Sequence, residues 1–175
     1  MKTLRDIEAI ANQLLDKTFE IKARGTVYRI CPREIGYKFK WDSAKRRFGC
    51  CNYGKLHISL SKPLCEINLD KIHGKITDTI LHEIAHALCV DIYGRVDGRG
   101  HGANWVSIAK QIGCDGKRCY DGNSVEKPQA KYTLTCPTCG REARRHKAPK
   151  NGIACGVCCN GVYNAQHKFI IQKNW

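Results

Sequence analysis

The spacing of apolar residues predicts three helices. In residues 3–17 apolar side chains recur every three or four positions, and Thr3 is placed to act as the N-cap. A longer pattern of the same kind covers residues 68–89, and a shorter one covers residues 103–113 and ends at a glycine. The glycine-rich residues 93–102 between them predict a loop.

Residues 26–61 show a different pattern, in which polar and apolar side chains alternate. The alternation is clearest in YKFKW (37–41) and LHISL (56–60), and glycines punctuate the run. This pattern predicts short antiparallel strands. Together with the helices, it indicates an α+β fold in which helices pack on a short antiparallel sheet.

The C-terminal part of the chain differs in composition. Residues 114–130 are polar and rich in glycine and aspartate, which indicates a linker. The chain of 175 residues has a formal net charge of +14, and residues 126–175 contribute half of it, with nine lysines and arginines against two acidic residues. We therefore predict two domains, residues 1–125 and residues 126–175. A segment as short as the second usually needs a metal or disulfides to fold.

The large positive charge indicates an anionic partner, most often nucleic acid, although a merely soluble basic protein would also show it. The N-terminal residues lack the unbroken apolar stretch of a secretory signal, and no run approaches the length of a membrane span. We therefore expect a cytoplasmic monomer without a membrane partner, nucleoid-associated if the charge serves DNA binding. In a reducing compartment, the twelve cysteines predict metal ligands and buried side chains rather than disulfides.

Residues 77–91, TDTILHEIAHALCVD, place polar side chains inside an aliphatic helical run. His82 and His86 are four positions apart, so both can direct a ring nitrogen to one point on the same face of a helix. Zinc bound in this way lowers the pKa of a bound water, and Glu83 is placed to accept the proton of that water. The alternative is a helix with two ordinary histidines. The rarity of the motif and its helical context favour a catalytic zinc site.

Two histidines require a third protein ligand if one position is to remain open for water. His101 is the best candidate, because glycines on both sides of it let the backbone turn sharply toward the metal. His73 falls on the opposite side of the predicted helix. His57 lies on a predicted strand, which favours a surface or supporting position.

Two CxxC pairs with fifteen residues between them predict a second metal site. This spacing is specific for a structural zinc held by four thiolates, although Cys159 beside the last cysteine leaves the fourth ligand ambiguous. Most of the remaining cysteines are expected to pack in the core, and Cys114 with Cys119 is a weaker candidate for a redox or metal pair. The predicted ligands are Cys136, Cys139, Cys155 and Cys158.

A basic cluster lies between these two cysteine pairs. Cations that follow phosphates, near aromatic rings on which bases stack, are typical of proteins that bind single strands without sequence preference. The alternative is that the aromatic residues fill a small core and the charges face solvent. The candidate DNA contacts are Arg141, Arg144, Arg145, Lys147 and Lys150, with Tyr132, Tyr163, Phe169 and Trp175 around them. The basic residues 45–47 extend this surface or simply face solvent.

The motifs RRFGCC, ISLS, TILHEIAHAL, GHGANW and YTLTCPTCG…CGVCCNGVY follow the order found in the SprT-like family, which the chain resembles over residues 35–165. The resemblance implies a small zincin-like metalloprotease domain followed by a zinc ribbon. It implies that His82, His86 and His101 hold a catalytic zinc, that Glu83 is the general base, and that the four cysteines hold a structural zinc. Spartan-type members of this family cleave proteins bound or crosslinked to DNA, and DNA activates them.

We therefore expect a DNA-stimulated zinc endopeptidase that acts on proteins associated with DNA, with single-stranded character in the DNA. Two alternatives remain: a zinc protease with a soluble target, and a nucleic-acid-binding protein that keeps the zincin fold without proteolysis. For the protease, we expect residues 56–60 to form the sheet edge beside the catalytic helix, where an extended peptide would add as a further strand. Specificity would then come from tethering on DNA.

Overall fold

A computed structural model describes residues 2–118 and 125–175 of the chain, so the candidate Cys119 lies outside the described residues. The chain divides into two compact units, Met1–Lys127 and Pro128–Trp175, which are described separately below. Both are small mixtures of helices and strands, and the predicted α+β class is confirmed.

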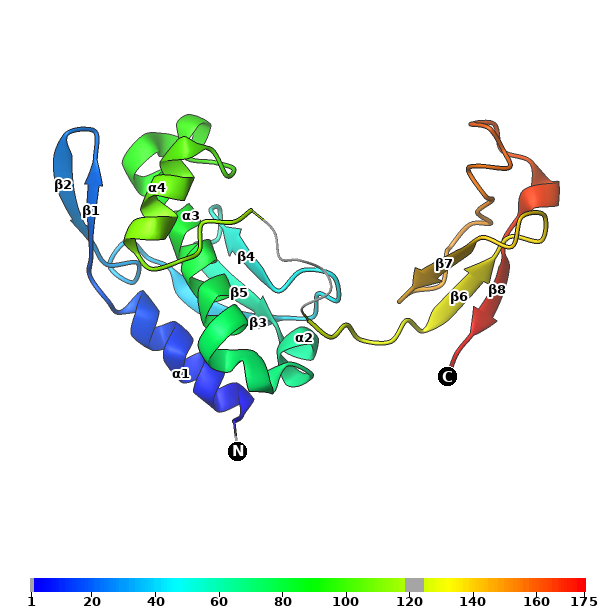
Figure 1. The fold of residues 1–175 in the computed structure, drawn as a ribbon, viewed down its shortest axis with the longest axis horizontal. Coiled ribbons are helices and arrows are strands. Elements are labelled where there is room, and N and C mark those ends of the chain that lie inside the picture. Colours follow the sequence, from blue (N-terminus) through cyan, green and yellow to red (C-terminus); the bar gives the residue numbers. More distant parts are fainter. Residues whose placement is uncertain (1, 119–124) are drawn as a thin grey trace. The chain divides into compact units, whose positions relative to one another are not determined.

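The N-terminal unit contains four α-helices and five strands among its described residues (Figure 1). In chain order these are α1 (Leu4–Leu15), β1 (Phe19–Ala23), β2 (Thr26–Ile30), β3 (Lys38–Asp42), β4 (Gly49–Asn52), β5 (His57–Ser61), α2 (Lys62–Glu66), α3 (Thr77–Asp97) and α4 (Ala103–Gln111). The predicted cap of α1 is confirmed, since Asp6 N–H donates to Thr3 Oγ1 at 3.3 Å and Thr3 N–H donates to Asp6 Oδ2 at 2.6 Å.

A three-stranded sheet has the order β3-β5-β4, with β4 antiparallel to β5 but β3 parallel to it. The expectation of a wholly antiparallel sheet with residues 56–60 at its edge is therefore wrong. β4 lies between β3 and β5 in sequence and forms a hairpin with β5, which leaves the other side of β5 to β3. The sequence of β4, GCCN, has no alternating pattern that would have revealed it. Consequently β4, not β5, is the edge strand that packs beside α3.

The long helix also differs from its prediction. Residues 69–76 form a 3₁₀ turn, η1 (Leu69–Lys71), and a π-helical turn, η2 (Ile72–Ile76), and α3 then runs to Asp97 instead of ending at residue 89. Gly94, with φ 77° and ψ 175°, breaks the helix near its end, inside the segment predicted as a loop. The apolar periodicity could not show the π-helical turn, because Ile72 and Ile76 are buried by it as a regular helix would bury them.

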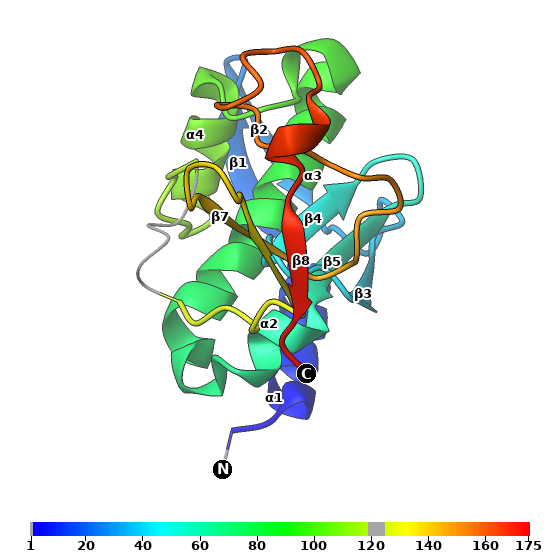
Figure 2. The same ribbon diagram turned by 90° about the vertical axis from the view of Figure 1, so that its right-hand side faces the viewer.

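The core lies between the sheet and the helices. Helices α1 and α3 pack against each other and on strands of the sheet, while α4 packs on α3 (Figures 1 and 2). Strands β1 and β2 form a separate antiparallel hairpin. The side chains buried most completely in this core include Ile7, Leu15, Ile58, Leu60, Ile80, Ile84, Leu88 and Trp105. Among the described residues, no helix combines the length and apolar character needed to cross a bilayer.

The C-terminal unit is a small antiparallel sheet with loops. Its strands are β6 (Tyr132–Thr135), β7 (Glu142–Arg145) and β8 (Ile170–Lys173), in the order β7-β6-β8, and a 3₁₀ turn, η3 (Ala165–His167), precedes β8. Within residues 128–175, the buried apolar side chains are Leu134, Cys136 and Cys155. Because a core this small cannot stabilise a domain, the unit requires a further cross-link.

Candidate functional site

The structure brings the three predicted histidines together. His82 and His86 lie one turn apart on α3, and His101 lies in the loop between α3 and α4. The Nε2 atom of His101 is 2.9 Å from that of His82 and 3.1 Å from that of His86. Three nitrogens bound to one tetrahedral ion would be about 3.3 Å apart, so these side chains fit a metal ion at the point on which they converge.

Two features of the chain position His101 against the helix. Gly98 ends α3 where the backbone is so close that a Cβ would lie 2.5 Å from the Cys89 carbonyl oxygen, so only glycine fits there. Trp105 of α4, 1% exposed, then packs its ring beneath all three imidazoles, with centroid distances of 4.5 to 5.1 Å. The loop and the tryptophan together form a support that holds the histidines in place.

The histidines are held in the form that binds metals. Burial, together with the smaller effect of the neighbouring imidazoles, lowers the pKa of His82 to about 4 and that of His86 to about 3. Burial also lowers the pKa of His101. All three rings are therefore neutral near pH 7, and neutral imidazole is the ligand that a divalent metal requires.

Glu83 is buried on the same helix beside this cluster, with 7% of its surface exposed. Burial raises the pKa of Glu83 to about 7, while the backbone N–H of Cys51 and the charge of Arg47 lower it. The hydrogen bond from Cys51 fixes the carboxylate against β4. A carboxylate with a pKa near neutrality is suited to take up and release protons.

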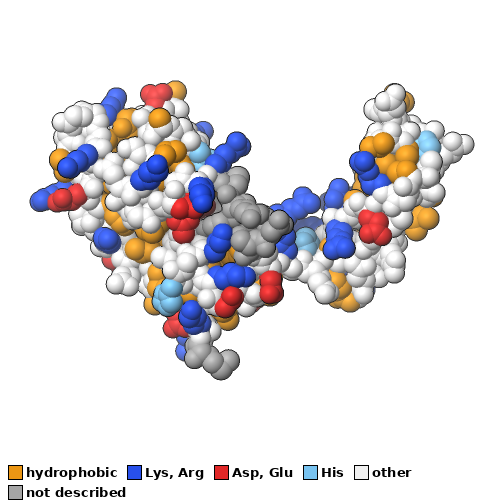
Figure 3. Space-filling model, in the orientation of Figure 1, with side chains coloured by type: hydrophobic (Ala, Val, Ile, Leu, Met, Phe, Trp, Pro, Cys, Tyr) orange, Lys and Arg blue, Asp and Glu red, His pale blue; other side chains and the backbone are white. Residues whose placement is uncertain are grey.

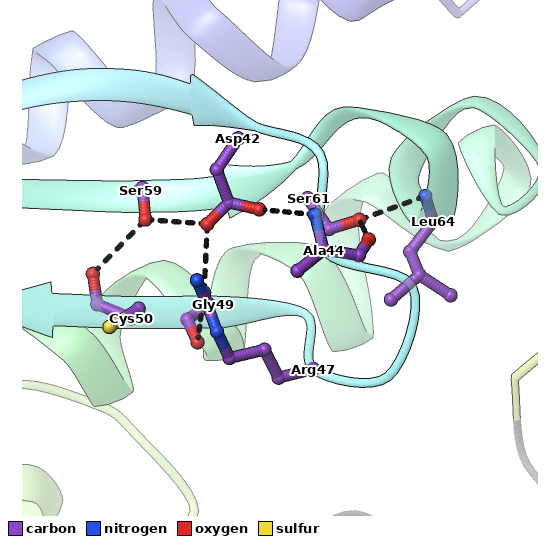
Figure 4. A network of polar contacts seen from close by, with 8 residues as sticks. All are labelled: Asp42, Ala44, Arg47, Gly49, Cys50, Ser59, Ser61 and Leu64. Carbon is purple, nitrogen blue, oxygen red and sulfur yellow. Dashed lines mark hydrogen bonds and ion pairs between the residues drawn. The ribbon is translucent and has the colours of Figure 1, made fainter. Parts of the chain in front are cut away.

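A polar network fixes β4 in this position (Figure 4). Arg47 Nη1 is 2.8 Å from Asp42 Oδ2 and donates to the Gly49 carbonyl at 3.3 Å. Ser59 donates to the same Asp42 oxygen at 2.9 Å, and the Ala44 N–H donates to the other at 2.8 Å. Asp42 thus ties β3, β5 and the start of β4 together. Sequence reasoning missed this residue, because an aspartate at the end of a strand usually faces solvent.

A cavity of about 380 Å³ opens beside Glu83 and His82. It lies within the N-terminal unit and is bounded by the start of β4, the first turns of α3, and residues that follow α4. Phe48, Gly49, Thr79 and Val125 contribute apolar surface to it. Glu83 and His82 therefore border a hollow that can hold part of a ligand.

The four predicted cysteines also converge. Their sulfur atoms lie within 4.8 Å of one another, with Cys136 Sγ 3.9 Å from Cys158 Sγ and Cys139 Sγ 3.8 Å from Cys155 Sγ. Sulfurs bound to one tetrahedral zinc would be about 3.8 Å apart, so the set fits a metal. The ambiguous Cys159 instead directs its Sγ to the Asn164 carbonyl, at 3.8 Å.

Backbone groups prepare two of these thiols for a metal. Although burial opposes the shift, the N–H groups of Cys139 and Thr138 lower the pKa of Cys136 to about 6. The N–H groups of Cys158 and Val157 lower the pKa of Cys155 in the same way. Because the thiolate is the metal-binding form of cysteine, both turns are arranged to favour ligation.

A third group of possible ligands consists of Asp78, Cys114 and Asp115. Here the Asp115 N–H donates to Asp78 Oδ1 at 2.8 Å, and the Lys117 N–H donates to Asp115 Oδ1 at 2.8 Å. These bonds attach the chain after α4 to the start of α3, which accounts for the group without a metal. Cys114 is buried, as expected for a packing residue.

The predicted DNA contacts are all exposed but do not form one surface. Arg144 and Arg145 are consecutive on β7 and therefore point to opposite faces of the sheet. Across the strands, Tyr132 pairs with Arg145 on one side and with Lys173 on the other. One face thus carries an aromatic ring between two cations, and sequence reasoning missed Lys173. Arg141, Lys147 and Lys150 lie in loops, and lysines and arginines are present on the displayed face of both units (Figure 3).

Comparison with known proteins gives a consistent result. The sequence model of the SprT-like family matches residues 8–126. The chain is 30% identical over 86 residues to Protein SprT of Pasteurella multocida (strain Pm70), which is 47% of the chain and about half, 51%, of that protein. It is 27% identical over 148 residues to Protein SprT of Vibrio atlanticus (strain LGP32), 83% of the chain and 77% of that protein. No solved structure gives a significant match.

Proposed function

The chain belongs to the SprT-like family, and on this premise we propose that it is a zinc-dependent endopeptidase that cleaves proteins associated with DNA. The observation that carries the proposal is the convergence of three neutral histidines beside a buried glutamate. Three neutral imidazoles that can bind zinc, beside a carboxylate that can accept a proton, are suited to hydrolysis of a peptide bond.

His82, His86 and His101 would hold the zinc, leaving one position open. When bound, the metal supplies a Lewis acid that polarises the peptide carbonyl and makes water more acidic. Glu83 accepts a proton from the attacking water and delivers it to the leaving amine, for which its pKa near 7 is suited. The Cys51 N–H keeps the carboxylate oriented through both transfers.

Strand β4 is the edge at which a substrate would bind. The Ser61 N–H donates to the Phe48 carbonyl, so in this antiparallel pair the groups of Gly49 and Cys51 point away from β5, to the open edge. The Cys51 N–H on this edge already donates to Glu83, so an extended peptide would pair with other groups of the edge and pass beside the carboxylate. Main-chain pairing of this kind selects for extended backbone and little for side chains.

The C-terminal unit is proposed to be a zinc ribbon that binds DNA. Four thiolates would hold its zinc, and the face with Tyr132 between Arg145 and Lys173 would accept a single strand, with phosphates on the cations and a base on the ring. Binding there raises the effective concentration of any protein on the same DNA at the active site. The choice of substrate would therefore depend on which proteins are bound to the same DNA.

The test is cleavage of a histone at fixed low salt, with and without single-stranded DNA, by wild type and by Glu83→Gln, both with two zinc ions per chain verified. The proposal predicts cleavage that needs both Glu83 and DNA. Cleavage that needs Glu83 but not DNA would replace it with a protease for a soluble target. If no cleavage depends on Glu83, while wild type and Glu83→Gln both bind DNA equally, the chain would instead be a DNA-binding protein without proteolytic activity.

A further inference from the structure

The cavity beside Glu83 has a charged rim that the catalytic roles above do not use. Glu83 and His82 form part of its wall, so whatever fills it lies beside the reacting groups. Its volume of about 380 Å³ is enough for one side chain of a bound peptide. Five basic side chains line it, namely Arg46, Arg47, Lys117, Arg118 and Lys127.

The acidic side chains of the cavity already have partners within the fold. Asp78 accepts the Asp115 N–H, Asp115 accepts the Lys117 N–H, and Glu83 accepts the Cys51 N–H. These carboxylates stay where backbone donors hold them. Their charges offset part of the positive charge, but the lining still holds five cations against three carboxylates.

The cations, by contrast, are mostly unneutralised. Arg47 pairs with Asp42 at 2.8 Å. In residues 2–118 and 125–175, no carboxylate forms an ion pair with the other four, which are exposed: Arg46, Lys117, Arg118 and Lys127. Four unpaired positive charges around one small hollow create a local potential that attracts an anion.

Apolar side chains, among them Phe48 and Val125, also line the cavity. Apolar and cationic groups in one cavity complement a side chain that has a methylene stem and ends in a carboxylate. We propose that this cavity is a specificity pocket that takes an acidic side chain of the substrate, glutamate in particular, next to the scissile bond. The proposal rests on the peptidase function above and adds a side-chain preference to it.

The same cations could instead extend a DNA-binding surface, but the geometry favours a peptide. A phosphodiester backbone binds along open grooves, whereas these cations surround a hollow whose wall includes the Glu83 carboxylate. A peptide paired with β4 would place a side chain in that hollow.

The test uses peptides that are identical except for Glu, Gln or Lys at the two positions on each side of the scissile bond. For the zinc-loaded full chain at low salt, we expect kcat/KM for Glu to exceed that for Gln about fivefold at one position, and Lys to be poorest. The double variant Arg46→Ala/Lys117→Ala should bring the Glu-to-Gln ratio close to one. Lys45→Ala, an exposed neighbour that does not line the cavity, is the matched control and should keep the preference.

Arg46→Glu provides a second variant and should shift the preference toward the Lys peptide. The proposal is overturned if Glu83-dependent cleavage shows no Glu preference, or if the preference survives the double variant. It is also overturned if that variant weakens binding of single-stranded DNA and leaves the peptide ratio unchanged. Absence of Glu83-dependent cleavage of every peptide would instead count against the peptidase function itself, so the two failures are distinguishable.

Discussion

Gly49 and Glu83 are in such close contact that a Cβ on the glycine would lie 2.7 Å from the carboxylate oxygen Oε1 and 2.8 Å from Cγ. Strand β4 can approach α3 this closely only because residue 49 has no side chain. The absence of that methyl group lets the Cys51 N–H reach the carboxylate. The position of β4 therefore determines the position of the Glu83 carboxylate.

Gly49→Ala should displace Glu83 while leaving the histidines in place. Since a positioned acid–base group typically contributes about 100-fold to 10,000-fold in rate, we expect kcat to fall at least about tenfold with zinc content unchanged. Steady-state kinetics and metal analysis would measure both. Gly54→Ala is the control, because the nearest atom to its added Cβ would be 3.7 Å away; equal effects of the two substitutions would contradict the argument.

His101→Ala should remove one of the three convergent nitrogens and lower zinc affinity of the N-terminal site by more than about 100-fold. His73→Ala should leave that affinity unchanged, because His73 lies exposed on the π-helical turn before α3. Competition titration against a zinc chelator would compare the two variants. Similar zinc affinities for the two variants would mean that His101 is not a strong ligand.

Asp42→Asn should destabilise the chain by about 1–2 kcal/mol at pH 7, because Asp42 accepts hydrogen bonds from Ala44, Ser59 and Arg47. Burial raises the pKa of Asp42, but these donors outweigh it and hold the pKa below its ordinary value of 3.8. The stabilisation is therefore present above that value and is lost as pH falls through the lowered pKa. Denaturant unfolding of both proteins from pH 7 to pH 3 would measure it. A constant difference across this range would exclude the mechanism.

Cys155→Ala should unfold the C-terminal unit and remove one zinc per chain, because the unit buries few side chains besides Leu134 and its cysteines. Cys159→Ala should retain both metals, since the Cys159 sulfur points to the Asn164 carbonyl instead of the cluster. Metal content and amide protection in residues 128–175 would separate the variants. Loss of metal from Cys159→Ala would reassign the fourth ligand.

Lys173→Ala should weaken binding of single-stranded DNA and reduce the slope of log affinity against log salt by about 0.7, the value for one lost phosphate contact. Arg144→Ala should have less effect, because Arg144 lies on the opposite face of the sheet from Tyr132 and Lys173. Anisotropy titrations at several salt concentrations would show this. Equal losses would mean that both faces, or neither, contact DNA.

The sequence was sufficient to predict which side chains converge, because short spacings join most members of each candidate ligand set and flanking glycines indicate His101. His82 and His86 meet through the period of one helix, and the CxxC pairs meet through their turns. The supporting structure was not predictable in this way. The edge strand GCCN has no alternation, and its identity depends on Gly49 meeting Glu83, which lies 34 positions further along the chain.

Prediction from the local sequence pattern was also wrong where the same pattern is compatible with two structures. Ile72 and Ile76 are apolar at helical spacing whether the turn is α or π, so the start of α3 was placed too early. Arg144 and Arg145 formed a single cluster in sequence, but a strand sends consecutive side chains to opposite faces. Lys173 joined the surface only through the pairing of β6 with β8.

The division of the chain also sets an order of events during synthesis. His82, Glu83, His86 and His101 all belong to the unit that ends at Lys127, whereas the four cysteines of the other unit are translated afterwards. Because domains usually fold in the order of their translation, these four side chains come together before the unit proposed to bind DNA has been made. Under the proposed function, the nascent chain would thus assemble its peptidase groups before it could be localised to DNA.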